Sequence, residues 1–330
     1  MRAAILGAGA WGTALALSLG ARHHIALWVW DAGQLEAMRR RRVNASFLPG
    51  FPIPERIELT GDLEAALSDA ELALVVVPTS ALRATFRSIA GSGRRPPVIW
   101  ASKGFEAESA RLPHQVAEEE LPADVPRAVL SGPSFAVEVA RGLPTAITLA
   151  SNDHRFAVET ARLLHSPRLR IYSSDDLVGA EVGGAVKNVI AIAAGVADGL
   201  GFGHNARAAL ITRGLAEITR LGLQLGGRME TFMGLAGAGD LILTCTGDLS
   251  RNRRVGLLLA ASRPLHAILD EIGQVAEGVH TARAVRSLAH KHGIEMPITD
   301  AVCRLLFEEY SATAAVEELL SREPKAENAP

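Results

Sequence analysis

The stretch AAILGAGAWG, residues 3–12, decides how the first half of the chain can fold. Its first four residues are apolar, as in a buried strand, and Gly7, Gly9 and Gly12 follow with the spacing G-x-G-x-x-G. Glycines at this spacing permit a tight turn, a close approach of the backbone to a pyrophosphate, and close packing of the next helix on the strand. The stretch therefore predicts a strand, a turn and a helix that bind a dinucleotide.

Short apolar runs alternate with helical patterns from this point to about residue 172. The residues expected as strands are 3–6, 25–30, 72–77, 98–101, 128–130, 146–149 and, as a last addition, 169–172. The residues expected as helices are 11–20, 32–40, 80–90, 115–121 and 136–140. Strands that are apolar on both faces and alternate with helices predict a doubly wound, mostly parallel sheet of the Rossmann type.

The pattern changes after about residue 177, where strand signals stop. Helical periodicity continues through 178–197, 206–225, 253–260, 281–290 and 301–310. We expect an α/β protein with a dinucleotide-binding domain over residues 1–177 and an all-helical substrate and catalytic domain over residues 178–330. The polar segment 321–330 contains two prolines and is expected to be a disordered tail.

Composition narrows the class of protein further. A chain of 330 residues is long enough for about two domains, and its net charge of −2 creates no basic field for nucleic acid. Two cysteines cannot form a disulfide framework, which favours a reducing, cytoplasmic location. The uncharged run 3–21 resembles a leader peptide, but three glycines interrupt it, and the other uncharged runs are too short to span a membrane. We therefore expect a soluble protein without a membrane span.

The end of the second expected strand normally selects the dinucleotide. Asp31 follows Trp30 there and could accept a hydrogen bond from a ribose 2′-hydroxyl, which favours NAD. Four arginines at residues 39–42 could instead meet the 2′-phosphate of NADP, or they could form a solvated helix end. The sequence leaves the choice between NAD and NADP open.

Lys187 is the only charged residue between Glu181 and Asp198, inside the apolar run VGGAVKNVIAIAAG that begins at residue 182. A helix that is apolar all round is buried, and a buried ammonium is unfavourable unless it is paired or functional. Lys187 could be paired structurally or reach the surface, or burial could lower its pKa so that it works as a general base. These alternatives stay open. Asn188 beside it could orient a ligand by hydrogen bonding.

Two later segments carry residues that suit an anion. The segment SRNRR, residues 250–254, places Ser250 as a helix N-cap beside three guanidinium groups, which fits a phosphate but also an exposed basic turn. The glycine-rich segment GLAGAGD, residues 234–240, is expected to be a loop that ends at Asp240 before a helix. Asp240 could be a helix cap, and the glycines indicate a close approach by a ligand or another helix.

Two loops at the carboxyl edge of the expected sheet also carry polar residues. Lys103 follows the strand at 98–101, and Gly132 and Ser134 follow the strand at 128–130, with Ser134 placed to cap the next helix. Ligands of open α/β folds bind at this edge. We find no metal-binding signature, because the histidines lack carboxylate partners at ligand spacing.

Taken together, these segments resemble the bacterial-type NAD(P)-dependent glycerol-3-phosphate dehydrogenase family over nearly the whole chain. The matching segments are GAGAWGTA (7–14), SKG (102–104), SGPSF (131–135), GGAVKNVIAI (183–192), GLAGAGDL (234–241), SRNRR (250–254) and EGV (277–279). The first is shared by many dinucleotide-binding enzymes, whereas the order of the lysine helix, the glycine–aspartate segment and the basic segment is specific.

The resemblance implies hydride transfer between the nicotinamide and C2 of sn-glycerol 3-phosphate or dihydroxyacetone phosphate, with Lys187 as the proton acceptor. It implies a substrate site made of Lys103, Gly132, Ser134, Lys187, Asp240, Thr244, Ser250, Arg251 and Asn252. It implies an NAD or NADP site made of Gly7, Gly9, Ala10, Trp11, Gly12, Trp30, Lys103, Ala136, Arg251, Val275 and Glu277. It also suggests a role in glycerophospholipid synthesis.

One departure from the family concerns Trp30, because the family often has His or Arg at this position and Trp cannot pair with a 2′-phosphate. Two other functions are compatible with the sequence: a related β-hydroxy-acid dehydrogenase, and a protein that senses a dinucleotide without catalysis. The Gly183–Gly184 pair and alanine-rich faces of the helical part could pack against a second subunit, which would give a homodimer, or they could pack within the domain.

Overall fold

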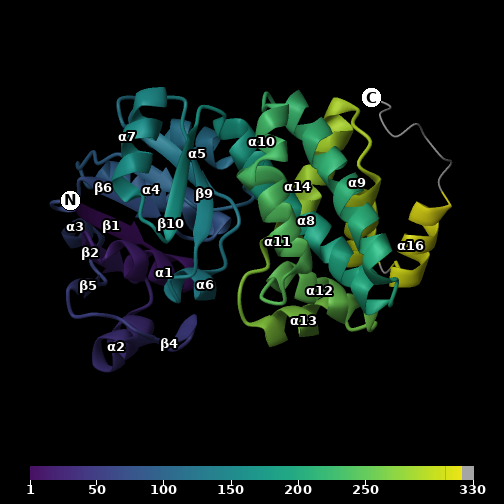
Figure 1. Cartoon of the computed structure of the whole chain (residues 1–330), viewed down its shortest axis with the longest axis horizontal. Coiled ribbons are helices and arrows are strands. Elements are labelled where there is room, and N and C mark those ends of the chain that lie inside the picture. The colour runs from purple at the N-terminus through teal and green to yellow at the C-terminus, as the bar shows by residue number, and fades with distance from the viewer. Residues whose placement is uncertain (309, 322–330) are drawn as a thin grey trace.

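The computed structural model describes residues 1–308 and 310–321, with the sheet and its helices on one side and a helical half on the other (Figure 1). The eight-stranded sheet has the order β10-β9-β8-β7-β6-β1-β2-β5. Its strands are β1 (Arg2–Leu6), β2 (His24–Trp28), β5 (Ile57–Thr60), β6 (Leu72–Val75), β7 (Val98–Trp100), β8 (Arg127–Ser131), β9 (Thr145–Ala150) and β10 (Leu169–Ser174). A separate two-stranded ribbon consists of β3 (Val43–Asn44) and β4 (Leu48–Pro52).

The mostly parallel sheet expected from the sequence is confirmed. The strands from β5 across to β8 run parallel, whereas β9 is antiparallel to β8 and β10 is parallel to β9. Strand β5 at the sheet edge was not expected from the sequence, because Glu58 is exposed there and interrupts the apolar run. Strands β3 and β4 were not expected either, because β3 has only two residues and β4 contains two prolines and a glycine.

Helices cover both faces of the sheet because its strands are apolar on both sides. They are α1 (Ala10–Leu19), α2 (Ala32–Arg41), α3 (Leu63–Leu67), α4 (Thr79–Gly91), α5 (Pro113–Glu120), α6 (Ala136–Ala140) and α7 (His154–Leu164). Ala3 and Ile5 of β1 pack in a core with α1, α2 and α7. Ala4 and Leu6 face the opposite way, into a core with α3, α4 and α5. Alternate residues of one strand thus serve two helical layers.

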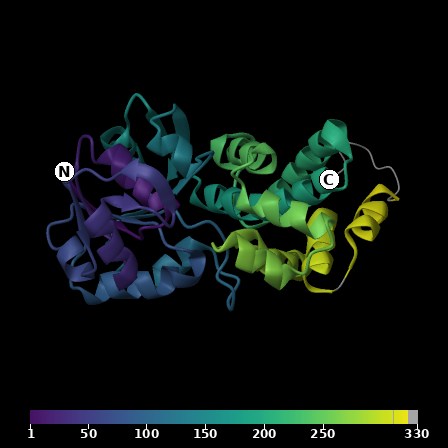
Figure 2. The same cartoon turned by 90° about the horizontal axis from the view of Figure 1, so that it is seen from below.

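After β10, helices are the only regular elements among the described residues, and Figure 2 shows them together in one half. Its elements are α8 (Leu177–Gly199), α9 (Gly203–Gln224), α10 (Met229–Met233), the π-helical turn η1 (Leu235–Gly239), α11 (Asp240–Thr246), α12 (Arg251–Ala260), α13 (Leu265–Ile272), α14 (Glu277–His292), α15 (Pro297–Phe307) and α16 (Ala312–Leu320). The proposed domain boundary at 177/178 stays a prediction, with β10 ending at Ser174 and α8 beginning at Leu177. Of the expected tail 321–330, all but Ser321 lies outside the described residues.

Helix α8 is the centre of the helical half. It is long and apolar enough to cross a membrane, but 94% of its most apolar 18-residue stretch is buried inside the protein. A Cβ added to Gly195 would lie 2.0 Å from the carbonyl oxygen of Arg253, and one added to Gly256 would lie 2.0 Å from that of Ile192. The glycines therefore allow α8 and α12 to touch backbone to backbone, so α8 is a core helix.

One alternative that the sequence leaves open is decided, and two local expectations were wrong. Gly183 packs against the backbone of Ala236 and Gly184 against Ser131, so this glycine pair serves contacts within the chain. The segment 234–240 is largely helical, because η1 leads directly into α11. Ser134 does not cap α6; its hydroxyl donates to the carbonyl oxygen of Gly132 at 2.9 Å.

Candidate functional site

The glycine turn between β1 and α1 has three different glycine environments. Gly7 has φ +118°, and a Cβ added there would lie 2.5 Å from the carbonyl oxygen of Val76. A Cβ added to Gly12 would lie 1.9 Å from the carbonyl oxygen of Gly7, whereas one added to Gly9 would have nothing within 4 Å. Gly7 thus forms the turn, Gly12 lets the helix pack, and Gly9 leaves open space over the backbone. This arrangement fits the pyrophosphate of a dinucleotide at the α1 N-terminus.

Two amide side chains hold this turn, and the sequence analysis missed both. Asn44, fully buried on β3, donates from Nδ2 to the carbonyl oxygen of Ala8 at 2.9 Å and to Oγ1 of Thr13 at 2.8 Å. Gln34 of α2 donates from Nε2 to the same Ala8 oxygen at 2.7 Å. No motif surrounds Asn44, so only the fold reveals that it fixes the turn.

Two lysines and one carboxylate form the most buried charged cluster of the site. Lys187 Nζ, on α8, lies 2.6 Å from Asp240 Oδ1 and donates to Thr244 Oγ1 at 2.8 Å. Lys103 Nζ, from the loop after β7, lies 2.7 Å from Asp240 Oδ2. Lys187 is 6% exposed and Asp240 is 1% exposed. One carboxylate therefore orients both ammonium groups, and it uses no oxygen to cap α11.

Burial and charge act in opposite directions in this cluster. Burial lowers the pKa of Lys187 to about 8, while the negative charge of Asp240 acts to raise it. Burial acts to raise the pKa of Asp240, but the positive charges of Lys103 and Lys187 outweigh that effect and keep it below its usual value. Asp240 therefore stays ionised, and Lys187 can gain and lose a proton close to neutral pH, as a general acid–base group must.

The loop after β8 completes one wall of this cluster. Lys103 Nζ donates to the carbonyl oxygen of Gly132 at 3.0 Å, which brings Gly132 and Ser134 beside the lysines. Ser131, at the end of β8, is 2% exposed and its hydroxyl has no hydrogen-bond partner. A Cβ added to Gly184 would lie 2.8 Å from that hydroxyl. Ser131 is thus a further polar group facing α8, which the sequence analysis did not include among the site residues.

The start of α12 contributes the basic segment. Ser250 is the N-cap, as expected, and its hydroxyl accepts from the amide of Arg253 at 3.2 Å. Asn252 donates to Asn188 Oδ1 at 2.9 Å and accepts from the amide of Gly278 at 3.0 Å, which ties α12 to α8 and α14. Arg251 is exposed and forms a hydrogen bond with Gln274 at 3.2 Å. The guanidinium of Arg251 has no carboxylate within ion-pair distance among the described residues, unlike Arg253 and Arg254.

Glu277, the first residue of α14, meets the carboxyl edge of the sheet. Its Oε1 accepts from the amide of Thr79 at 3.1 Å, and Gly104, with φ +157°, packs beside it. The hydroxyls of Thr79 and Thr281 are buried here without a partner. Unpaired buried hydroxyls next to the glycine turn suit a polar ligand, so these residues fit a bound dinucleotide.

The other residues expected at the cofactor form no described hydrogen bond with the cluster of Lys103, Lys187 and Asp240. Trp30 is 82% exposed after β2, and Val275 is 39% exposed before α14. Ala136 is the half-buried first residue of α6, and Trp11 is half-buried in the first turn of α1. The structure thus joins Lys103, Lys187, Asp240, Thr244 and Gly132 directly, and it leaves the outer residues apart.

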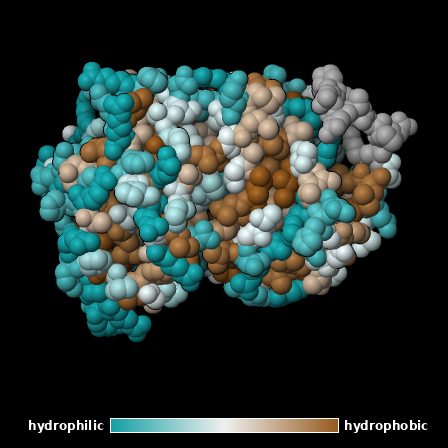
Figure 3. All heavy atoms as spheres, in the orientation of Figure 1, coloured by the Kyte–Doolittle hydropathy of each residue, from teal (hydrophilic) through white to brown (hydrophobic). Residues whose placement is uncertain are grey.

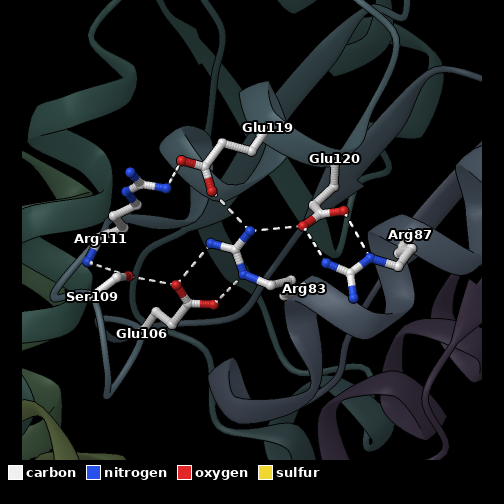
Figure 4. Close-up of polar contacts among 7 residues, drawn as sticks. All are labelled: Arg83, Arg87, Glu106, Ser109, Arg111, Glu119 and Glu120. Atoms are coloured by element: carbon white, nitrogen blue, oxygen red, sulfur yellow. Dashed lines mark hydrogen bonds and ion pairs between the residues drawn. The ribbon is translucent and has the colours of Figure 1, made fainter.

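An ion-pair cluster holds the loop that carries Lys103, and it is shown in Figure 4. Arg83 of α4 forms two hydrogen bonds with Glu106 of this loop, at 2.7 and 2.8 Å. The same guanidinium pairs with Glu119 at 2.8 Å and Glu120 at 2.7 Å on α5. Hydrogen bonding to Arg83 lowers the pKa of Glu106 to about 2, so the cluster stays charged at physiological pH.

Residues 1–308 and 310–321 contain no cluster of side chains suited to a metal ion and no reactive thiol. No group of three or more His, Cys, Asp or Glu side chains there could hold a metal ion. Cys245 and Cys303 are free and buried, and burial raises the pKa of each thiol to about 12. A thiol with so high a pKa is a poor nucleophile at neutral pH.

Comparison with known proteins matches both halves of the chain. Residues 2–157 match the family model for the NAD-dependent glycerol-3-phosphate dehydrogenase N-terminus, and residues 176–317 match that for its C-terminus. The glycerol-3-phosphate dehydrogenase [NAD(P)+] of Nitrosospira multiformis is 64% identical over 99% of both chains. That of Thiobacillus denitrificans is 58% identical over 99% of this chain and 100% of its own.

A crystal structure of glycerol-3-phosphate dehydrogenase from Coxiella burnetii is similar with a TM-score of 0.94 and 45% identity. The similarity covers 97% of this chain and 99% of that one. The chain belongs to the NAD-dependent glycerol-3-phosphate dehydrogenase family, and it is an oxidoreductase that uses NAD or NADP.

Proposed function

We propose that this member of the family interconverts sn-glycerol 3-phosphate and dihydroxyacetone phosphate at the lysine cluster, with Lys187 as the acid–base group. The observation that carries this assignment is the contact of the buried Lys187 ammonium with Asp240 at 2.6 Å. A pKa of about 8 lets the amine exist in both protonation states near neutral pH. A dinucleotide sensor without catalysis would have no use for such a group.

The nicotinamide, when bound, supplies or accepts the hydride at its C4. During oxidation, neutral Lys187 accepts the proton of the C2 hydroxyl of glycerol 3-phosphate. During reduction, the Lys187 ammonium returns a proton to the carbonyl oxygen at C2. Hydrogen bonds to Asp240 and Thr244 fix the position of Lys187 Nζ, so proton transfer needs little rearrangement of the side chain.

The substrate phosphate is assigned to the start of α12. Arg251 offers a guanidinium group whose described partner is the neutral amide of Gln274, and the first turn of α12 offers free amide groups next to Ser250 and Asn252. Lys103, Gly132 and Ser134 close the opposite side of the substrate site. Binding energy from the phosphate then positions C2 at Lys187.

The cofactor is assigned to the open space over Gly9 and to the sheet edge around it. Gly7, Gly9, Ala10, Trp11 and Gly12 would hold the pyrophosphate. The remaining cofactor contacts are assigned to Trp30, Lys103, Ala136, Arg251, Val275 and Glu277. Their support is the open space over Gly9 and the unpaired hydroxyls beside Glu277.

Cellular setting and assembly are also part of the proposal. Two free, buried cysteines favour the cytoplasm, where the enzyme would supply glycerol 3-phosphate for phospholipid synthesis. Figure 3 shows apolar side chains gathered over the helical half. Met233, Ile242 and Leu249 are exposed apolar residues of this half. Such a surface suits a homodimer. Sedimentation at two protein concentrations tests it, and a monomer at both would rule it out.

The reaction itself is tested by absorbance of the reduced nicotinamide with dihydroxyacetone phosphate as substrate. Consumption of NADH or NADPH is expected, and unphosphorylated dihydroxyacetone should react far more slowly because Arg251 has nothing to bind. Equal rates with both substrates would favour a β-hydroxy-acid type of dehydrogenase. Binding of cofactor without turnover would favour the sensor.

Replacing Arg251 by methionine is expected to raise KM for dihydroxyacetone phosphate by roughly 10- to 100-fold, the value of one charged hydrogen-bonding group. The fold-decrease in kcat should be smaller than the fold-increase in KM. Arg254→Met is the matched control, because Arg254 lies on the same helix but pairs with Glu271 at 2.7 Å. Steady-state kinetics measure both variants, and an equal KM for dihydroxyacetone phosphate in the two would contradict the assignment of the substrate phosphate to Arg251.

Replacing Arg83 by methionine is expected to loosen the loop that carries Lys103. The KM for dihydroxyacetone phosphate should then rise by up to roughly tenfold. Arg87→Met is the control, because Arg87 pairs with Glu120 but does not contact Glu106. Its KM should remain close to that of the wild type. If the two variants have the same KM, the hydrogen bonds between Arg83 and Glu106 do not position Lys103.

A further inference from the structure

A second buried carboxylate, that of Glu181, lies near the start of α8, and its side chain is 1% exposed. Its Oε1 accepts hydrogen bonds from the indole Nε1 of Trp100 at 2.7 Å and from the backbone amide of His114 at 2.9 Å. Its Oε2 lies 2.5 Å from Nδ1 of the same histidine. Glu181 thus joins α8 of the helical half to β7 and α5 of the other half.

These contacts reach both of the elements that carry the lysines of the site. Trp100 is the last residue of β7, and Lys103 follows in the next loop. Glu181 and Lys187 share α8, where they lie about 9 Å apart along the helix axis. Between them, a Cβ added to Gly184 would lie 3.5 Å from Lys103 Cγ, so α8 runs directly beside that lysine side chain. Glu181 therefore joins the two segments from which the lysines extend.

The partners of Glu181 are themselves held firmly. Trp100 is fully buried in the sheet, where β7 lies between β6 and β8. The ring of Phe86 packs edge-on against its indole, with 5.7 Å between ring centroids. His114 lies in the first turn of α5. If α8 shifted, the indole N–H and the carboxylate would lose their partners inside the protein, which is unfavourable, so these contacts favour one position of α8 against β7.

The His114–Glu181 pair limits the charge that is buried here. Burial raises the pKa of the Glu181 carboxyl above its usual value. Burial acts to lower the pKa of His114, but the hydrogen bond and the negative charge of Glu181 outweigh that effect and raise it. Both groups thus hold a proton to higher pH than usual. A proton between the carboxylate and the imidazole cancels a charge that would otherwise be buried without compensation.

We propose that Glu181 is a positioning residue for catalysis, which holds the lysine of α8 and the lysine after β7 at the spacing that the substrate requires. This inference rests on the proposed acid–base role of Lys187. Asp240 joins the two ammonium groups to each other, whereas Glu181 joins the backbone segments that carry them. Glu181 acts through α8, because it determines where Lys187 Nζ lies relative to C2 of the substrate.

Glu181→Met removes the carboxylate and keeps the length of the side chain. The kcat for reduction of dihydroxyacetone phosphate is expected to fall by roughly 10- to 100-fold, because a catalytic group misplaced by about 1 Å lowers the rate by up to that order. The Kd for NADH, measured by calorimetry, should change by less than about twofold, because the glycine turn on β1 and α1 is a separate site.

Glu217→Met is the matched control. Glu217 is likewise a buried carboxylate, 1% exposed, and it accepts from the backbone amides of Ile298 at 2.6 Å and Thr299 at 3.1 Å. It lies on α9, which carries neither lysine. The control variant should lose thermal stability but keep the wild-type kcat per folded enzyme. An equal fall in kcat in both variants would mean that Glu181 only supports the fold.

Glu181→Gln is the conservative variant that should restore the function. Its amide oxygen takes the place of Oε1 and accepts from Trp100 Nε1 and from the backbone amide of His114. Its Nε2 takes the place of Oε2 and donates to Nδ1 of a neutral His114 ring. Its kcat should stay within about threefold of the wild type, because every hydrogen bond keeps a partner. A glutamine variant as slow as Glu181→Met would contradict the inference.

A double-mutant cycle with Lys187→Met separates positioning from a loss of folded enzyme. If Glu181 acts through Lys187, Glu181→Met should lower kcat by less than about twofold in a chain that already lacks the lysine. Trp100→Phe, which removes the indole donor and keeps an aromatic ring beside Phe86, replaces Glu181→Met in the cycle if that variant does not fold.

The outcomes of the cycle distinguish the inference from the proposed function. A wild-type kcat in the clamp variant, Glu181→Met or its replacement Trp100→Phe, overturns the inference while the acid–base role of Lys187 stands. An equal fold-decrease with and without Lys187 overturns it in the same way. A wild-type kcat in Lys187→Met alone refutes the proposed function, and the inference with it.

Discussion

Lys187→Met is expected to lower kcat by on the order of 10²–10⁴-fold, which is the usual contribution of a positioned general acid–base group. Methionine fills the same apolar space on α8, and Asp240 keeps Lys103 as a partner, so the fold should survive. Because Lys187 acts in the chemical step, the Kd for NADH should change little. Steady-state kinetics and calorimetry with the same preparation measure the two effects.

Lys187→Arg separates proton transfer from charge. Arginine keeps the positive charge beside Asp240, but its pKa lies too high for it to act as a base. If Lys187 works as the base, the arginine variant is expected to be nearly as slow as the methionine variant. If the arginine variant keeps most of the wild-type kcat, the role of Lys187 is electrostatic and the acid–base assignment is wrong.

The pH profile of the wild type follows from the same group. Oxidation of glycerol 3-phosphate needs neutral Lys187, so kcat/KM in this direction should fall as pH drops below about 8. Reduction of dihydroxyacetone phosphate needs the ammonium, so kcat/KM in that direction should fall as pH rises above the same value. The acid limb for oxidation should be absent from the residual activity of Lys187→Met.

Much of the fold could be predicted because its signals are local. The glycine turn at 7–12 and the apolar strands around it are continuous in sequence, and the structure has them in the expected order. Among the strands that the sequence does not predict, β5 has a partly exposed edge, where burial rather than local pattern decides the conformation. The glycines of the segment 234–240 predict a loop, but close packing on α8 makes η1 helical.

The candidate site could be predicted only as separate parts. Lys187 stood out because it is one charge in an apolar helix, yet its pairing with Asp240 spans 53 residues, and that of Lys103 with Asp240 spans 137. The sequence is compatible with Asp240 as a helix cap, and only the fold shows that both its oxygens face lysines. Ser131 and Asn44 carry no motif, because burial and contact give them their roles.

Asp240→Asn is expected to reduce kcat/KM by on the order of 10²-fold. The neutral amide no longer anchors the two ammonium groups, and a displacement of the catalytic nitrogen by about 1 Å lowers the rate by a factor of this order. The change also has an electrostatic signature. Since the negative charge of Asp240 raises the pKa of Lys187, its removal should lower that pKa further below its usual value. The acid limb of kcat/KM for glycerol 3-phosphate oxidation should therefore move to lower pH.

Asp198→Asn is the matched control, because Asp198 also bridges two cations, Arg207 at 3.1 Å and Arg253 at 2.7 Å, at the other end of α8. Both variants lose a largely buried carboxylate and should lose thermal stability. Only Asp240→Asn should move the pH profile, because Asp240, unlike Asp198, contacts Lys187 Nζ. A profile that is unchanged in Asp240→Asn, or equally displaced in both variants, would mean that Asp240 supports the fold but does not tune the proton-transferring lysine.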